Sequence, residues 1–328
     1  MTAPRAAVAL VLLLAGCPHR DRPAIEWKPV LEGDPRGLFL SAWGPAADEV
    51  WVVGGQQHQG VALVGSADAG FTQRALPEGT PLLDWVHGTG SDDVWVGGIS
   101  GTLLHWNGTG WEDFSIATDA AIWGIYAKSP TEAYAVGGTS SWGGDRAVAF
   151  AWDGQSWAPM DLPAAARDAA SLFKVTDAGD AVWMVGVDGL ALRATGGQAL
   201  VSVPTGYADD LVTVNAMGGP LIAVGGRGTG AVLEVEGDGL AVKAEARAGL
   251  EGVTVFSPTE ALVTGENGFT GLYHIDTDVL DEVPAVTEDV LHGSFAASDG
   301  RLYAVGGNLF TAGSTFAGTM LSAPAPGE

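Results

Sequence analysis

Short apolar runs that end in glycine recur along most of the chain and are separated by polar, turn-forming residues. Each run has an aromatic or aliphatic residue, then two small or apolar residues, then the glycine. Successive glycines lie 39 to 49 residues apart, with a mean spacing of 42. A recurring period of this length indicates a repeat architecture. The seven runs are Trp51–Gly54, Trp95–Gly98, Tyr134–Gly137, Trp183–Gly186, Ile222–Gly225, Leu262–Gly265 and Tyr303–Gly306.

Each copy of the repeat is predicted to contain four short strands. The apolar run is the second strand, and a first strand such as Leu38–Gly44 precedes it across a turn of Pro, Ser, Asp or Gly. A third strand such as Thr102–Trp106 follows the glycine and turns back into a fourth. These turn residues adopt positive φ angles or hydrogen-bond to the local backbone, which favours hairpins. The apolar runs do not alternate cleanly with polar residues, which indicates strands covered on both faces.

A single sheet of this size buries too little apolar surface, whereas sheets stacked face to face in a ring bury both faces. Seven copies at the mean spacing need about 294 residues, and residues 25–322 provide 298. Ser-Pro-Thr-Glu-Ala occurs at Ser129 and again at Ser257 because the same hairpin returns three repeats later. The sequence therefore predicts one all-β domain at residues 25–322, a seven-bladed β-propeller with four-stranded antiparallel blades.

The last copy lacks a fourth strand, since the sequence stops soon after its third strand, Gly318–Ala323. The first segment of the predicted domain, Ala24–Val30, has no partner within its own copy. Its Trp27-Lys-Pro-Val matches Trp157-Ala-Pro-Met, which fills the fourth-strand position of the third copy. We therefore predict that the N-terminal strand completes the last blade, three strands plus one, and closes the ring.

The first residues are predicted to lie outside the propeller. Residues 1–16 have the pattern of a signal peptide, because Arg5 precedes an apolar run of about ten residues that is too short to cross a bilayer as a helix. Leu14-Ala15-Gly16-Cys17 resembles the lipobox of bacterial lipoproteins, which implies cleavage before Cys17 and acylation of its thiol. Several acyl chains give a stable membrane anchor. Residues 17–24 are then a lipidated tether, and residues 323–328 a C-terminal tail.

This resemblance implies a location in the bacterial cell envelope. Pro18, where an aspartate would imply inner-membrane retention, favours the outer membrane and leaves the periplasmic or surface side open. Cys17 is the only cysteine, so the stability of the domain must come from burial and not from disulfide bonds.

The chain is strongly acidic, with a formal net charge of −24, or −25 once residues 1–16 with their one Arg and no acidic residue are removed. Such a surface repels phosphate groups, which excludes nucleic acid as a partner. Glycine accounts for 49 of 328 residues and apolar residues for 47% of the chain. This composition excludes general disorder and fits many short strands joined by tight turns.

The hairpins between third and fourth strands carry the most specific local motifs. Ser66–Gln73 resembles the Asp-box of BNR-type propellers, with Gln73 in place of the usual aromatic residue, and His105–Trp111 and Trp152–Trp157 are similar to it. The Gly-Gly after the second strand also resembles kelch repeats. The resemblance implies that the Asp or Asn side chain bonds to turn amides while the Trp packs between sheets. It implies an architecture and no particular activity.

Enzymes built on such propellers need groups that this chain does not bring together. A sialidase-like site needs an arginine cluster on the inner strands, and no arginine of the predicted propeller lies in their cores. Galactose-oxidase-like chemistry needs a Tyr–Cys crosslink and copper, which the single Cys17 cannot supply. No histidines share a metal-ligand spacing, and Asp276–Glu282 lacks the residue order of a calcium loop. We expect no metal, no cofactor and no catalysis.

Isolated histidines and inner-strand tryptophans are expected to be structural. His105 and His274 are predicted on third strands of different blades, and His87 and His292 near inner strands, where lone histidines fill polar niches. The inner-strand tryptophans are expected to plug or line the channel as part of the core. They are Trp43, Trp85 and Trp123.

A ligand is expected on the face where the second strands end, because rigid strands there hold variable loops around the channel mouth. The longest of these loops carries Trp142 among glycine, amide and charged residues, which suits a sugar ring or a peptide. The alternative is that Trp142 packs against its own blade. The candidate binding residues are Gln56, Gln57, His58, Trp142, Asp145, Arg146, Arg227, Glu266, Asn267, Asn308 and Phe310.

The leading hypothesis is a monomeric, membrane-anchored, extracytoplasmic scaffold that binds an envelope protein or a glycan without catalysis. A rival hypothesis is a divergent carbohydrate-active enzyme, of the sialidase or glycosidase kind, that uses Asp209 and Asp210 in a connection between blades. A third is a purely structural envelope protein with no specific ligand.

Overall fold

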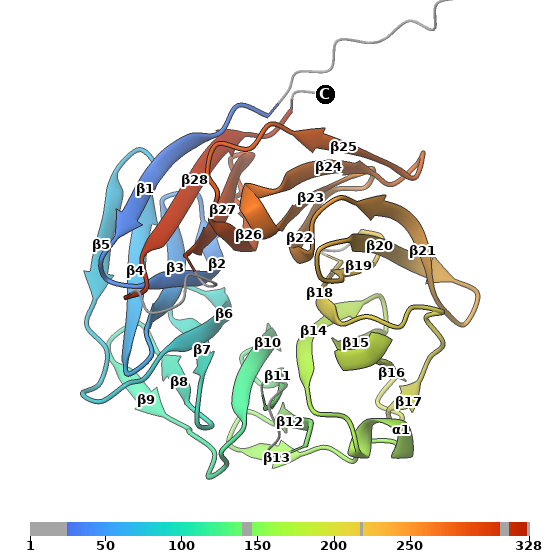
Figure 1. Ribbon diagram of the computed structural model, residues 1–328. Helices are drawn as coiled ribbons and strands as arrows, with labels where there is room; N and C mark the ends of the chain where they lie inside the picture. Colours follow the sequence, from blue (N-terminus) through green and yellow to red (C-terminus); the bar gives the residue numbers. More distant parts are fainter. Residues whose placement is uncertain (1–24, 140–145, 217–218, 309–314, 327–328) are drawn as a thin grey trace, which may run out of the picture.

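The protein is a seven-bladed β-propeller (Figure 1). The computed structural model describes residues 25–139, 146–216, 219–308 and 315–326. Seven four-stranded antiparallel sheets stand around one axis, and each chain segment between blades leads from an outer strand to the next inner strand. The predicted fold class is confirmed. The proposed signal peptide and tether, including Cys17, lie outside the described residues.

Each blade contributes one strand to each of four positions, which run from the channel to the outside of the ring. From blade one to blade seven, the innermost strands are β2 (Leu38–Ala46), β6 (Leu83–Gly90), β10 (Ala121–Ser129), β14 (Leu172–Ala178), β18 (Leu211–Asn215), β22 (Leu250–Ser257) and β26 (Val290–Ala296). The second strands are β3 (Glu49–Gln56), β7 (Asp93–Gly98), β11 (Glu132–Gly138), β15 (Ala181–Gly186), β19 (Ile222–Gly225), β23 (Glu260–Gly265) and β27 (Arg301–Gly307). The third strands are β4 (Gln59–Ser66), β8 (Leu103–Trp106), β12 (Val148–Trp152), β16 (Ala191–Thr195), β20 (Gly230–Glu236), β24 (Thr270–His274) and β28 (Gly318–Pro324). The outermost are β5 (Gly70–Arg74), β9 (Trp111–Asp113), β13 (Trp157–Pro159), β17 (Val201–Ser202), β21 (Gly239–Ala246), β25 (Val279–Val283) and β1 (Lys28–Asp34).

Helical structure in the described part of the chain is limited to short turns on the loops: α1 (Ala164–Arg167), η1 (Val187–Gly189) and η2 (Glu266–Gly268). Within the same residues, no helix has the length and apolar character needed to cross a membrane.

Each interface between neighbouring blades holds its own hydrophobic cluster. The described residues form seven such clusters, one for every interface around the ring. Between blades seven and one, for example, the fully buried Phe39 and Tyr303 belong to one cluster. Because each sheet is covered on both faces, its strands are apolar on both faces, which explains why the apolar runs do not alternate with polar residues.

Every innermost strand has a β-bulge at the same position. In blade one, Phe39 pairs with the repeat glycine Gly54 and Ser41 pairs with Val53, so the pairing skips Leu40. In each blade, the skipped residue directly follows the residue that pairs with the repeat glycine. A bulge bends its strand and changes the direction of the residue that it leaves unpaired. The seven skipped residues are Leu40, Asp84, Trp123, Phe173, Val212, Glu251 and His292.

The bulge explains the glycine that marks the repeat. At Gly306, a Cβ atom would lie 1.8 Å from the carbonyl oxygen of Val290 on the facing strand, and the same clash occurs at the other six repeat glycines. These glycines are therefore required for close backbone approach and not for a positive φ angle.

The predicted closure of the ring is confirmed. Strand β1 pairs with β28 in the last blade, with Lys28 opposite Ser322, so the first and last strands lie side by side (Figure 1). Two boundaries differ from the prediction: β1 continues past Val30 to Asp34, and β28 continues past the predicted domain end to Pro324. The indole of Trp27 is buried just before β1 and donates to the Oγ1 of Thr270 in blade six at 2.9 Å.

The expected hairpin chemistry is confirmed in blades two and three. Asn107 Oδ1 accepts hydrogen bonds from the amides of residues 109 and 110, and Asp153 Oδ1 accepts them from residues 155 and 156. Trp111 packs edge-on against Trp51 of blade one, with ring centroids 6.0 Å apart. Blade one differs, because Asp68 pairs with Arg301 of blade seven.

Candidate functional site

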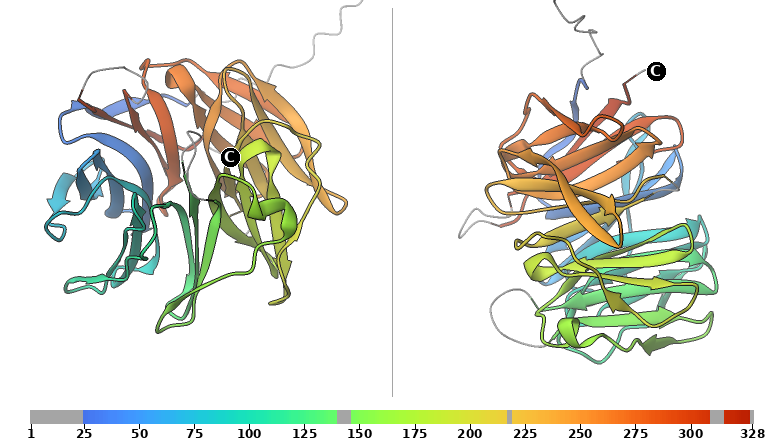
Figure 2. Two further views of the ribbon diagram at one scale, coloured as in Figure 1. Left: turned by 60° about the horizontal axis from the view of Figure 1, so that its bottom comes forward. Right: turned by 90° about the vertical axis from the view of Figure 1, so that its right-hand side faces the viewer.

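Strand direction alternates within each blade, so the ends of the second strands and the connections between blades lie on one face of the ring, termed the loop face. The turns between first and second strands, and between third and fourth strands, lie on the opposite face, termed the hairpin face. The views in Figure 2 show the strands running between the two faces. The candidate binding residues that the structure describes belong to segments of the loop face.

Gln56 joins blade one to blade seven on the loop face. Its Nε2 donates to the carbonyl oxygens of Pro35 at 3.2 Å and Phe316 at 2.6 Å, and its Oε1 accepts from the Phe316 amide at 3.0 Å. The side chain that was predicted to bind a ligand thus holds together the two ends of the ring.

A pocket of about 440 Å³, termed the seam pocket, opens beside Gln56. Three of its lining side chains, Gln57, His58 and Gln59, are exposed and make no hydrogen bond within the described residues. Glutamine amides both donate and accept hydrogen bonds. Among the described residues, no Asp, Glu, Lys or Arg side chain lines the pocket, although the chain as a whole carries a net charge of −24. The seam pocket therefore suits a polar but uncharged group. Its lining residues are Gln56, Gln57, His58, Gln59, Thr315 and Phe316.

A second hollow, of about 450 Å³, lies between blades five and six. Glu266 and Asn267 line it with Phe269, and Arg247 forms an ion pair with Glu282 at its edge. The hydrogen bond from Arg247 lowers the pKa of Glu282. Since this pair is largely exposed, it adds little stability.

Glu266 is committed to holding loops together. Its Oε2 accepts hydrogen bonds from the amides of Gly228 at 3.1 Å and Gly249 at 3.2 Å. Asn267 follows it with a φ of 54°, a left-handed conformation that Asn adopts more readily than most residues. The next residue, Gly268, donates its amide to the Asp289 carbonyl at 2.7 Å. These contacts hold the turn at Glu266–Gly268 against the neighbouring loops of the same face.

Arg227 and the proposed catalytic residue Asp210 pair with each other. Arg227 contacts the Asp210 carboxylate at 3.1 Å, and the other oxygen of Asp210 accepts from the Asp188 amide at 3.1 Å. Asp209 is exposed beside them. Asp210 therefore links the loops of blades four and five.

The remaining candidates are dispersed or lie outside the described residues. Arg146 is exposed and pairs with Asp168 at 3.1 Å. Asn308 braces the base of the seventh blade's loop by donating to the Thr315 carbonyl at 3.2 Å and accepting from the Ala317 amide at 2.7 Å. The candidates outside the described residues are Trp142, Asp145 and Phe310.

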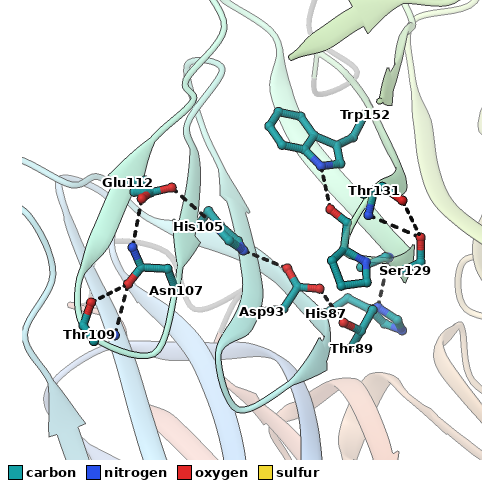
Figure 3. A network of polar contacts seen from close by, with 12 residues as sticks. His87, Thr89, Asp93, His105, Asn107, Thr109, Glu112, Ser129, Thr131 and Trp152 are labelled. Atoms are coloured by element: carbon teal, nitrogen blue, oxygen red, sulfur yellow. Dashed lines mark hydrogen bonds and ion pairs between the residues drawn. The ribbon is translucent and has the colours of Figure 1, made fainter. Parts of the chain in front are cut away.

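The hairpin face of blade two carries a continuous polar network (Figure 3). Asp93 accepts from Thr89 and contacts His105 Nε2 at 2.7 Å, while Glu112 lies 3.7 Å from the Nδ1 of the same imidazole. The imidazole stacks on Trp95, with ring centroids 4.3 Å apart. Burial acts to raise the pKa of Asp93, but hydrogen bonds from His105 and Thr89 hold it below its usual value. The network fixes the turn between β6 and β7.

A polar cluster at the channel was missed by the sequence analysis. Lys174 of blade four donates to the Trp123 carbonyl of blade three at 2.8 Å and holds its Nζ 4.4 Å from the centre of the Trp85 ring in blade two. Blade three stands between blades two and four, so Lys174 joins the innermost strands of three adjacent blades. His292 of blade seven lies there with Glu251 of blade six, with 3.9 Å between His292 Nε2 and Glu251 Oε2.

Asp84 also belongs to this cluster. Burial shifts the pKa of each of the four ionisable groups. Burial raises the pKa of Asp84 to about 8, against the opposing effect of Lys174, and raises that of Glu251 to about 7. Burial also lowers the pKa of Lys174 to about 8 and that of His292 to about 4. The sequence contained a signal for these residues: Asp84, Glu251 and His292 each directly follow a leucine near the start of an innermost strand.

The histidines occupy separate polar niches, as expected. The His87 ring accepts from the Ala127 amide at 3.1 Å, and His274 contacts Asp281 at 3.0 Å. In the described residues, no group of three or more His, Cys, Asp or Glu side chains is arranged to hold a metal ion.

No protein-family model matches the chain, and no curated protein sequence matches it. Its backbone is similar to a streptogramin B lyase structure, with a TM-score of 0.70 and 14% sequence identity over 90% of this chain and 97% of that one. It is also similar to the WD40 repeats of RRP9, with a TM-score of 0.70 and 11% identity over 92% and 100% of the two chains. A third similar structure is YCF48 bound to D1 peptide, with a TM-score of 0.67 and 12% identity over 93% and 99%.

At these identities the likeness establishes the fold alone. The three proteins are a lyase, a WD40-repeat protein and a peptide-bound protein, so the shared architecture does not select one activity. Function must be inferred from the surface and the channel.

Proposed function

We propose that the chain is a lipoprotein of the bacterial cell envelope, anchored in the outer membrane through acylated Cys17, whose propeller binds another envelope protein without catalysis. The lipobox-like segment that ends at Cys17 supports the anchor. The loop face supports the binding role.

The seam pocket is the observation that carries the binding role. Gln57, His58 and Gln59 present polar side chains that have no partner among the described residues, on a base that Gln56 ties to both ends of the chain. A rigid base loses little backbone entropy on binding, so the main entropic cost is that of ordering the three exposed side chains. Backbone amides and carbonyls of a partner segment offer the uncharged polar groups that this pocket suits.

A comparison also favours a polypeptide ligand. YCF48, a propeller similar to this chain over 93% of its length, has been solved bound to D1 peptide. By contrast, the carboxylate proposed for a divergent enzyme, Asp210, is engaged by Arg227 and the Asp188 amide. Both observations favour the scaffold hypothesis over the carbohydrate-active enzyme.

The test is capture of the partner from envelope extract by residues 21–328, followed by crosslinking and mass spectrometry. A triple variant, Gln57→Ala, His58→Ala and Gln59→Ala, should lose a partner that the unchanged chain retains stoichiometrically. The matched control is Gln155→Ala with Gln198→Ala, which removes two exposed glutamine side chains from the hairpin face. This control should retain the partner.

The other outcomes separate the rival functions. Retention of a glycan that the triple variant loses would replace the protein partner with a carbohydrate. Turnover of a glycan that disappears on Asp209→Ala and Asp210→Ala would establish the enzyme. The absence of any retained partner and of any turnover would leave a structural envelope protein.

The anchor has its own test. Expressed in a bacterial host, the full chain should fractionate with outer membranes, and Cys17→Ser should release it into the soluble fraction. Mass spectrometry of the mature N-terminus should find the acyl groups on Cys17. Fractionation that is unchanged in the variant would argue against lipidation.

A further inference from the structure

The channel has a polar centre near the loop face whose hydrogen-bonding groups are not all satisfied. The bulged residues Asp84, Glu251 and His292 lie near the starts of their innermost strands, and these strands begin at the loop face. Asp84 is only 3% exposed, yet its Oδ2 has no hydrogen-bond partner among the described residues. A buried carboxylate oxygen without a partner is unfavourable unless water or a ligand satisfies it.

The unsatisfied atoms of this centre are mainly acceptors. His292 donates through Nδ1 to the Leu40 carbonyl at 2.9 Å, and because burial keeps its imidazole neutral by lowering its pKa to about 4, its Nε2 carries no proton and can only accept. The Glu251 Oε2 lies 3.9 Å from this Nε2, too far for a hydrogen bond between them. One donor atom placed about 2.9 Å from each would satisfy both. The side chains of Glu251 and His292 are 14% and 18% exposed, so both groups are in contact with solvent.

Two acidic side chains of the cluster, Asp84 and Glu251, share Lys174 as the one cation coupled to both among the described residues. Burial raises the pKa of both carboxyl groups, and the nearby Glu266 adds to the rise at Glu251, so both groups hold protons in part at pH 7. A monovalent cation bound beside them would favour loss of these protons and pair with the carboxylate that forms.

Aromatic side chains complete the surroundings. Trp85 and Trp123 belong to innermost strands, and the Trp123 Nε1 is a buried donor with no partner among the described residues. Aromatic faces attract organic cations. A metal ion fits the site less well, because no three of these ligand types are close enough to coordinate one within the described residues.

We propose that the channel mouth binds a small organic ammonium group, which donates to both Glu251 and His292 Nε2 and favours ionisation of the second acidic side chain, Asp84. An ammonium nitrogen carries three donors, which matches a site made largely of acceptors. A hydroxyl group beside the ammonium would accept from the Trp123 indole. This site is independent of the seam pocket and of the lipid anchor.

The probe is ethanolamine, titrated by calorimetry at pH 7, with ethylene glycol as its uncharged analogue and KCl as an inorganic cation. Saturable binding of ethanolamine alone is expected. Glu251→Gln should weaken it at least about tenfold, as loss of a charge-assisted hydrogen bond predicts. His292→Asn keeps a donor for the Leu40 carbonyl and removes the Nε2 acceptor, so it should also weaken binding while the fold is retained.

Glu288→Gln is the matched control, since it removes the same charge from an exposed position of the loop face. It should leave ethanolamine binding unchanged. Binding should also release protons, measured from the dependence of the heat on buffer ionisation, and Asp84→Asn should reduce that release. The proposal is overturned if ethanolamine does not bind, if ethylene glycol or KCl binds equally well, or if Glu288→Gln weakens binding as much as Glu251→Gln.

Discussion

The indole of Trp27 donates a hydrogen bond to the hydroxyl of Thr270, 243 residues later in the chain, at 2.9 Å. Trp27 precedes the strand that completes blade seven, whereas Thr270 begins the third strand of blade six. The bond therefore secures the N-terminal strand to two blades at once, by backbone pairing with one and by a buried side chain with the other.

Trp27→Ala should destabilise the propeller by about 3 kcal/mol, because it removes a large buried side chain and leaves Thr270 without its donor. Trp27→Phe should lower the stability by about 1 kcal/mol, since it retains most of the apolar contact. Denaturant unfolding monitored by circular dichroism measures both. Lys28→Ala, at the exposed neighbouring position, is the control and should stay within about 0.5 kcal/mol of the unchanged chain.

Gly306→Ala should be strongly destabilising, by roughly 3 kcal/mol or by failure to fold, because the added Cβ would lie 1.8 Å from the Val290 carbonyl oxygen. Gly110→Ala adds the same methyl group where nothing lies within 4 Å, and it should change stability by no more than about 0.5 kcal/mol. Thermal melts of the two variants give the comparison. Equal effects would contradict the role assigned to the bulge.

Stability should fall as the pH rises from about 6.5 to 8. Between pH 4 and 6.5, two opposing effects on stability cancel. Asp84 and Glu251 hold protons in the folded state that they lose on unfolding, so their contribution to stability falls as the pH rises. His87 and His292 gain protons on unfolding, because burial lowers the pKa of each to about 4, so their contribution rises with the pH. Above that range only the carboxyl groups remain, and their raised pKa values favour unfolding as the pH increases. Near pH 8, Lys174 begins to lose its proton, which opposes the trend.

Asp84→Asn tests this assignment, since an amide cannot ionise and should flatten the fall. Urea midpoints of the unchanged chain and the variant at pH 6.5 and pH 8 are the measurement. An equally steep fall in the variant would assign the dependence to other groups.

Asp93→Ala should lower stability by about 2 kcal/mol, because it leaves Thr89 and the half-buried His105 without their acceptor. Glu112→Ala removes the more distant and exposed partner of the same imidazole and should have an effect below about 0.5 kcal/mol. Chemical denaturation of both variants distinguishes them. A larger effect for Glu112 would mean that the imidazole depends on its outer partner.

Most of the architecture could be predicted because it is repeated in the sequence. Each of the repeat glycines pairs with the residue directly before a bulge of the innermost strand, so the spacing of these glycines gives the number of blades. Trp27 likewise marked the closing strand by its match to Trp157, and the structure places both at the start or edge of an outermost strand. Local motifs of this kind recur in the sequence because equivalent backbone positions in different blades require the same residue type.

The channel cluster was not predicted, because the local signal at Asp84, Glu251 and His292 does not show which side chains meet at the channel. Lys174 and Trp85 are far apart in the sequence and meet only because the ring brings blades two and four to the same axis. Among the loop residues, Gln56, Glu266 and Asp210 were correctly placed on the loop face, yet each is engaged in contacts within the propeller. Sequence position identified the face but not which side chains are available to a ligand.

Closure by β1 and β28 makes the order of synthesis matter for folding. The segment from Lys28 is synthesised well before its partner at Ser322. Until then the first strand and the edge of β28 that it will cover cannot pair, and unpaired strand edges promote aggregation. Closure of the ring therefore requires two strands that are far apart in the sequence to meet, and a factor that shields the N-terminal strand until they do would raise the yield of the native ring.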